Sequence, residues 1–60
     1  MEMSTGIISS FKARRFLKWY EMQIGKEYDR QDMLNNRVSI IVYNLTETEK
    51  ELVNNWLAVN

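Results

Sequence analysis

One run of β-branched residues, RVSIIVY, constrains this chain more strongly than any other feature. β-Branched and aromatic side chains are enriched in strands, so the run predicts a strand over about residues 37–44. Successive side chains of a strand point to opposite faces, and here one face is apolar while the other still carries Ile41 and Tyr43. A strand of this composition needs cover on both faces.

A lone strand cannot satisfy its own backbone donors and acceptors, so this one needs a neighbour. Two neighbours are consistent with the sequence. The strand pairs either with residues 5–9, which include Ile7 and Ile8, or with its own copy across the two-fold axis of a homodimer. In the second case the expected dimer interface consists of Val38, Ile40, Ile41, Val42 and Tyr43.

A helix is predicted over about residues 10–24. At 100° per residue, five apolar side chains of this segment fall within an arc of about 100°, which indicates one buried stripe. These residues are Ala13, Phe16, Leu17, Tyr20 and Ile24. Ser9 or Ser10 is suited to cap the start of the helix, and Gly25 is suited to the left-handed conformation that ends it.

A second helix is predicted over about residues 47–58, because Thr46 and Glu49 have the spacing of a capping box. The intervening residues 26–36 are polar and predict a turn region, in which Asp29 and Asp32 cap one short turn. The expected fold is thus a single α+β domain spanning residues 1–60, with two amphipathic helices and one central strand.

The chain contains no cysteine and no histidine. This composition excludes disulfides and the common thiolate or imidazole metal sites, and it removes the side chains most used in acid-base and nucleophilic catalysis. No catalytic, cofactor-binding or metal-binding residue is therefore expected, and the protein is not expected to be an enzyme. Small domains usually need a source of stability beyond their hydrophobic core, such as a disulfide or a bound metal. For this chain the remaining source is association, most simply as a homodimer.

Charge is segregated although the chain holds eight cations and eight anions. Residues 1–26 carry a net charge of +3 and residues 27–60 a net charge of −3. Cations and large apolar side chains gather on the back of the first predicted helix, outside its buried stripe. The candidate partner-binding residues on this back are Phe11, Arg14, Arg15, Lys18, Trp19 and Met22.

Protein-protein binding is the function that this composition favours, with the cations steering association and the apolar groups supplying desolvated area. Nucleic-acid binding through the same cations is the main alternative, but a sequence pI near 6.2 is low for it. A peripheral membrane helix is a further alternative. Short chains of this kind resemble in type the small cytoplasmic regulators and inhibitors encoded by bacteria and their phages.

The segment RVSIIVYNLTETEKELVNNWL, residues 37–57, is similar to the strand and capped helix that open ribbon-helix-helix regulators. That resemblance implies dimerisation through the strand. The second helix of the family is missing from the sequence, and the face that would enter a DNA groove carries the apolar Ile41 and Tyr43, so no DNA-reading role is inferred.

Overall fold

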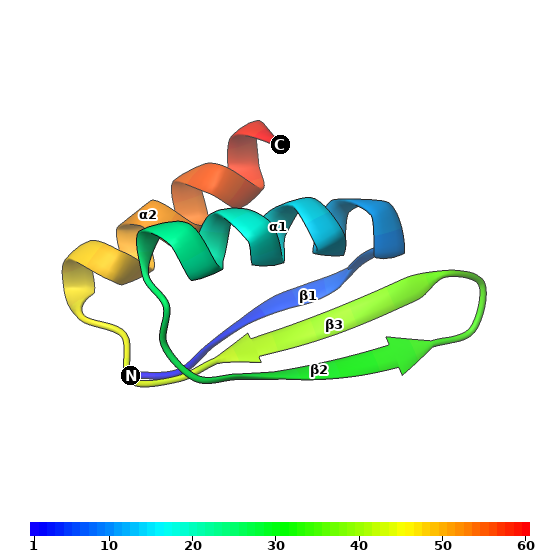
Figure 1. The fold of residues 1–60 in the computed structure, drawn as a ribbon, viewed down its shortest axis with the longest axis horizontal. Coiled ribbons are helices and arrows are strands. Elements are labelled where there is room, and N and C mark those ends of the chain that lie inside the picture. The colour runs from blue at the N-terminus through cyan, green and yellow to red at the C-terminus, as the bar shows by residue number, and fades with distance from the viewer.

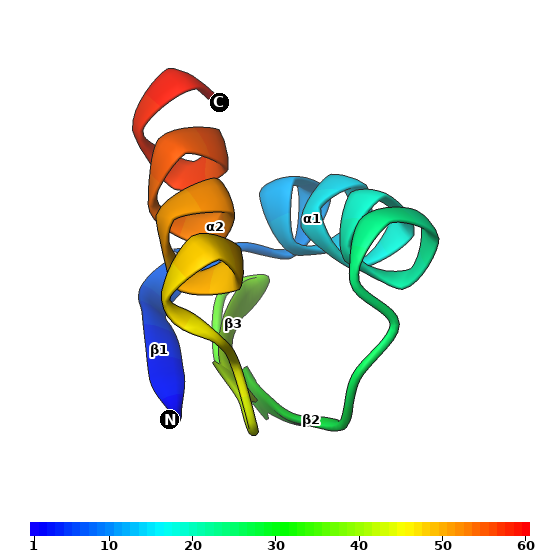
Figure 2. The same cartoon turned by 90° about the vertical axis from the view of Figure 1, so that its left-hand side faces the viewer.

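The computed structural model describes residues 1–60 and contains five elements of secondary structure. Their order is β1 (Met3–Ser9), α1 (Ser10–Gln23), β2 (Tyr28–Met33), β3 (Arg37–Val42) and α2 (Glu47–Val59). The strands form one antiparallel sheet in the order β1-β3-β2, and both helices lie over the same face of it (Figures 1 and 2). The α+β class predicted from the sequence is confirmed, with a helical layer above a three-stranded sheet.

The predicted strand forms β3, and it lies between two other strands. Of the two neighbours that the sequence allowed, the N-terminal segment is the one found, because Ile8 is paired with Val38 and Ser9 with Arg37. Both edges of β3 are hydrogen-bonded within the chain. Pairing of this strand with a second copy is therefore not observed, and β3 has no free edge on which to form it.

The second neighbour, β2, corrects the expectation of a turn region with Asp29 and Asp32 as caps. Both aspartates lie in the strand, opposite Ile41 and Val38 of β3. The chain reverses direction between the two strands at Asn35 and Asn36, whose φ angles of 62° and 57° are left-handed values that asparagine tolerates. This tight reversal places a polar segment along the free edge of an apolar strand, where backbone hydrogen bonds hold it.

Both helices begin and end close to the predicted residues. The Ser9 hydroxyl accepts a hydrogen bond from the Lys12 backbone N–H (3.0 Å) and caps α1. Past the end of α1, Gly25 has a φ angle of 72° and donates its N–H to the Tyr20 carbonyl (2.9 Å). Thr46 and Glu49 form the predicted capping box at the start of α2. Local sequence signals were sufficient here because each of these contacts spans only a few residues.

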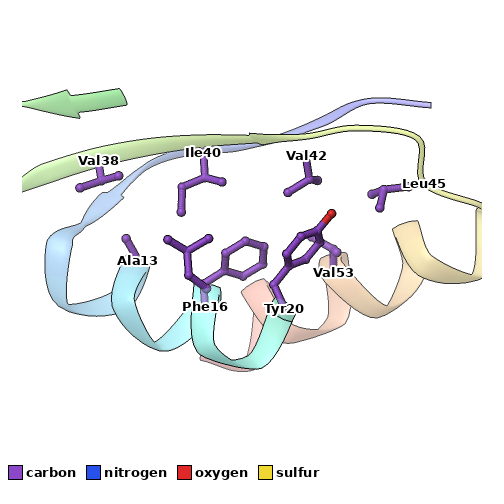
Figure 3. Packing of buried hydrophobic residues seen from close by; sticks show 9 residues of the cluster. Ala13, Phe16, Tyr20, Val38, Ile40, Val42, Leu45 and Val53 are labelled. Carbon is purple, nitrogen blue, oxygen red and sulfur yellow. The ribbon is translucent and has the colours of Figure 1, made fainter. Parts of the chain in front are cut away.

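The core lies between the sheet and the two helices (Figure 3). Four of the five residues in the predicted α1 stripe are buried, and the side chains of β3 that face them are at most 1% exposed. The nine buried residues are Ala13, Phe16, Leu17, Tyr20, Val38, Ile40, Val42, Leu45 and Val53. Apolar burial on this one face of the sheet supplies most of the driving force for folding.

The opposite face of the sheet has no helix over it, and both outer strands have a free edge (Figure 2). In β1 the register shifts between Ser4 and Ile7, and Gly6 within this bulge has a φ angle of 71°. In β2 the edge carries Arg30 and Asp32, which form an ion pair (2.9 Å). Bulges and charged side chains are features by which natural proteins prevent pairing between sheet edges.

Candidate functional site

The candidate site is the face of α1 that points away from the sheet. Because Phe16 and Tyr20 face the core, residues half a turn away from them on the helix must face solvent. Phe11 is 72% exposed and Met22 is 73% exposed, and three cations of the same face are exposed as well. This exposed face consists of Phe11, Arg14, Arg15, Lys18 and Met22, and it borders the partly buried Trp19.

A shallow cavity of about 290 Å³ lies on this face. It is lined by Arg15, Lys18, Trp19, Met22 and Gln23. The structure thus brings four of the six predicted partner-binding residues around one depression. Gln23 was not predicted to belong to this surface. It lies four residues, or one helical turn, after Trp19, and this spacing could have placed it on the same face.

Phe11 and Arg14 lie on the same helix but do not line the cavity. The Arg15 guanidinium lies over the Phe11 ring, 5.4 Å from its centroid. A cation in this position is attracted by the negative face of the ring. Phe11 therefore orients one of the cations at the cavity without lining it.

The cations of this surface have no acidic partner. The chain contains two ion pairs, Lys26 with Glu49 and Arg30 with Asp32, and neither involves α1. Unpaired cations on one face of a helix create a positive potential that attracts acidic groups and orients their approach. We name the surface formed by Phe11, Arg14, Arg15, Lys18, Trp19, Met22 and Gln23 the basic face of α1.

Trp19 forms the rigid part of the basic face. Its ring lies 5.9 Å from the ring of Phe16 and stacks at 5.9 Å on that of Trp56 from α2. Trp56 also meets Phe16 edge-on at 5.4 Å. Because Trp19 is held from below and from the side, it presents a fixed aromatic wall to the cavity, and a fixed ring loses little entropy when a partner contacts it.

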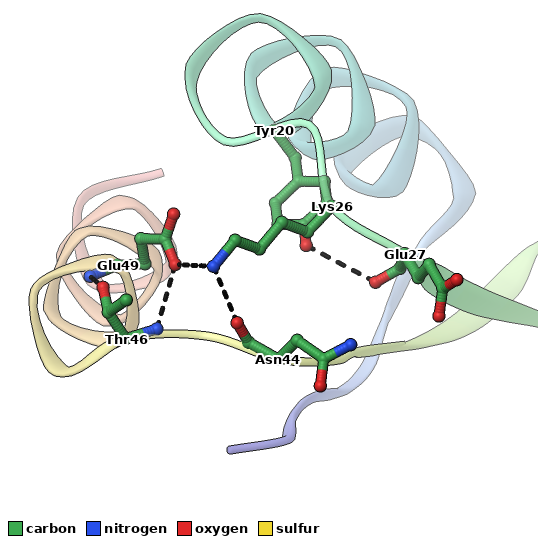
Figure 4. Close-up of polar contacts among 6 residues, drawn as sticks. All are labelled: Tyr20, Lys26, Glu27, Asn44, Thr46 and Glu49. Carbon is green, nitrogen blue, oxygen red and sulfur yellow. Dashed lines mark hydrogen bonds and ion pairs between the residues drawn. The ribbon is translucent and has the colours of Figure 1, made fainter.

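A polar cluster at the far end of α1 holds the two helices together (Figure 4). The Lys26 ammonium donates hydrogen bonds to the Asn44 carbonyl and to Oε1 of Glu49, both at 2.7 Å. The bond from Lys26 is the largest of the contacts that lower the pKa of Glu49, followed by the bond from the Thr46 backbone N–H. The Glu49 carboxylate therefore has its hydrogen-bond partners within the chain and is not free to bind a partner protein.

The phenol of Tyr20 lies close to this cluster and donates to the Glu27 carbonyl (3.5 Å). Burial, and secondarily the charge of Glu49, raise the pKa of the Tyr20 phenol. Sequence reasoning found Glu49 as a cap but not Lys26 as its partner, because these two residues come from segments 23 positions apart.

A second, larger cavity of about 420 Å³ lies at the end of the sheet. It is lined by Lys26, Glu27, Tyr28, Asp29 and Tyr43. The Tyr43 hydroxyl donates a hydrogen bond to Oδ2 of Asp29 (2.7 Å), and this bond raises the pKa of the phenol. Because Asp29 and Lys26 already have partners here, the cavity offers fewer free polar groups than the basic face.

The residues expected at a dimer interface lie on two faces of β3. Val38, Ile40 and Val42 are at most 1% exposed and pack under the helices, so these side chains make their contacts within one chain. Ile41 and Tyr43 lie on the uncovered face of the sheet and are partly exposed. β3 has apolar residues on both faces, but the helices cover only one of these faces.

No family model matches the chain, and neither the curated proteins nor the solved structures contain a significant match. Neither helix has the length and apolar character required to cross a bilayer.

Proposed function

We propose that the protein acts without catalysis, as a small regulator or inhibitor that binds another protein through the basic face of α1. The observation that carries this proposal is the meeting of unpaired cations with a fixed aromatic wall around one cavity. Interfaces combine an apolar anchor in a pocket with a charged rim, and Trp, Arg and Met are enriched in them.

The chemistry of the surface specifies its partner. Arg15 and Lys18 lie on the rim of the cavity and require carboxylates opposite them, while Trp19 and Met22 require an apolar side chain between those carboxylates. A helical segment supplies both at intervals of one turn. The expected partner segment is therefore an acidic amphipathic helix with one large apolar anchor.

A designed peptide tests this proposal. It has one Phe as its apolar anchor, with Glu one turn before and one turn after it, and a matched peptide carries Gln in place of Glu. We expect the acidic peptide to bind and the Gln peptide to bind about tenfold more weakly, which corresponds to about 1.4 kcal/mol. Trp19 lines the cavity and serves as the fluorescence probe.

Protein variants place the binding on the basic face. Arg15→Glu with Lys18→Glu should abolish measurable binding of the acidic peptide, whereas Arg37→Glu, on the other side of the molecule, should leave it unchanged. Equal binding of the acidic and Gln peptides would refute the proposal. Tighter binding of a single-stranded oligonucleotide, with a steep decrease as salt rises, would favour nucleic-acid binding instead.

A further inference from the structure

The chain itself contains a segment with the chemistry that the basic face requires. On α2, Glu47 and Glu51 lie one turn apart, are exposed, and take part in neither ion pair. Beside them Leu52 is 43% exposed and Val59 is 84% exposed. We name these four residues the acidic face of α2. Carboxylates next to large apolar side chains are the groups expected of a partner segment for α1.

The two faces lie side by side in one helical layer. Trp19 of α1 stacks on Trp56 of α2, and Trp56 lies on the same helical stripe as Leu52 and Val59, four residues after one and three before the other. At 100° per residue, Leu52 and Val59 fall between Trp56 and Glu51 around α2. Because Trp56 is on the side of α1, the order across the layer is basic residues of α1, then apolar residues of both helices, then acidic residues of α2. A surface with this order is complementary to itself after a rotation of 180°.

We propose that a second copy of the chain docks on the helical layer, so that the basic face of each α1 meets the acidic face of α2 in the partner. Each contact of α1 with α2 then occurs twice, and Phe11, Met22, Leu52 and Val59 become buried in the centre. Eight cations balance eight anions in the chain, so no net charge opposes the approach of a copy.

The two helices differ in direction. α1 runs along the longest axis of the molecule, which is 32 Å, while α2 rises obliquely beside it, so that the C-terminal half of α2 stands above α1 (Figures 1 and 2). In the dimer, this raised part of α2 in one copy is seated against α1 of the other.

The edges of the sheet are less suited to association than the helical layer. The bulge at Gly6 interrupts the free edge of β1, and the ion pair between Arg30 and Asp32 occupies the free edge of β2. Both features disfavour the extension of the sheet into a second copy. The homodimer expected from the sequence is thus assigned to the helices, and the strand through which it was expected lies in the middle of the sheet.

The dimer covers the basic face, and this consequence rests on the proposed function. A second copy and an acidic partner segment compete for Arg15, Lys18 and the cavity between them. Self-association therefore regulates partner binding, with free sites present at low concentration and covered sites at high concentration.

Sedimentation equilibrium tests the dimer directly. For the wild-type chain the weight-average mass should rise from 7.2 kDa towards twice that value as the concentration increases from micromolar to millimolar. A mass that stays at 7.2 kDa throughout this range overturns the proposal. Far-UV circular dichroism and thermal unfolding are used to check whether each substituted chain is folded.

Two complementary variants identify the faces. In one, Arg15→Glu and Lys18→Glu make α1 acidic; in the other, Glu51→Lys and Asn55→Lys make the exposed face of α2 basic. Each variant alone opposes like charges and should remain a monomer, whereas an equimolar mixture restores both attractive contacts and should form heterodimers. Dimerisation of either variant alone at the wild-type affinity overturns the proposal.

The matched control is Arg37→Glu, on the strand face that has no helix over it. It should leave the dimerisation constant unchanged, and a loss of dimer in this variant would move the interface to the sheet and refute our assignment. The acidic peptide is absent from these experiments. Peptide binding is measured separately, at concentrations at which the chain is a monomer. A mass that doubles at high concentration, with no peptide binding by the monomer, refutes only the proposed function, and peptide binding by a chain that stays a monomer throughout refutes only the dimer.

Discussion

Replacing Ile40 by alanine should remove much of the stability of this domain, whereas the same change at the neighbouring Ile41 should have a small effect. Ile40 is 0% exposed and lies under the helices, while Ile41 lies on the uncovered face of the sheet and is partly exposed. The two residues share a strand, a side-chain volume and a strand propensity. Only the face on which they lie distinguishes them.

The expected magnitudes follow from burial and from the size of the chain. Truncation of a fully buried Ile to Ala costs about 2 to 5 kcal/mol. A domain of this length has a total free energy of unfolding of about 3 to 9 kcal/mol, so Ile40→Ala should lie at the limit of folding. Ile40→Val, at about 0.5 to 1.5 kcal/mol, keeps the comparison measurable if the alanine variant does not fold. Ile41→Ala should cost less than about 1 kcal/mol because solvent already reaches this side chain.

Urea unfolding followed by tryptophan emission measures these differences. With a slope near 1 kcal/mol per molar urea, Ile40→Val should lower the midpoint by about 0.5 to 1.5 M. Each curve should be recorded at two protein concentrations, because a dimer is stabilised by mass action. Ile41→Val is the matched comparison for Ile40→Val. A substitution at Ile41 that loses as much stability as the same substitution at Ile40 would show that both faces of β3 are buried, and it would refute the single covered face.

Three further substitutions test local features of the fold. Thr46→Ala removes the cap of α2 and should lower the free energy of unfolding by about 1 kcal/mol in urea titrations. Gly25→Ala forces a side chain into the left-handed region at a φ angle of 72°, with its Cβ 3.4 Å from a helix carbonyl, and thermal unfolding should show a loss of about 1 to 2 kcal/mol. For Lys26→Met, the pH dependence of stability gives the readout. Because the pKa of Glu49 is lowered from 4.5 in the folded state, its contribution is present above that value and is lost as pH falls through the lower folded pKa; Lys26→Met should flatten this acid-side decrease.

The helices and the middle strand could be predicted from the sequence because their signals are local or periodic. Ser9, Gly25 and Thr46 act within a few residues of their own positions, and the buried stripe of α1 repeats with the helical period. The strand β2 could not be predicted in this way. Its six residues YDRQDM lack an alternating apolar pattern, and only Tyr28 among them is partly buried. The conformation of β2 depends on pairing with the edge of β3 that β1 leaves unpaired. This edge exists only once β1 and β3 have paired.

The candidate site was predictable to the extent that one helix contains it. Arg15, Lys18, Trp19 and Met22 recur at helical spacing, so their common face follows from the sequence alone. The stacking of Trp19 on Trp56 required the tertiary structure, because 37 positions separate the two rings. The same is true of the faces of β3. The sequence established that both were apolar, but only the positions of the helices decided which one became the core.

The aromatic cluster adds to the stability of the small core, as disulfides and metal sites do in other small domains. Phe16, Tyr20, Trp19 and Trp56 form a chain of ring contacts from the core to α2, and each contact adds about 0.5 to 1.5 kcal/mol beyond its buried area. Trp19 thus holds α2 in place and also forms the wall of the proposed binding cavity. Substitution of Trp19 would disturb stability and binding together and could not separate them. The charge variants at Arg15 and Lys18 are the sharper test because these side chains extend from the same surface without entering the cluster.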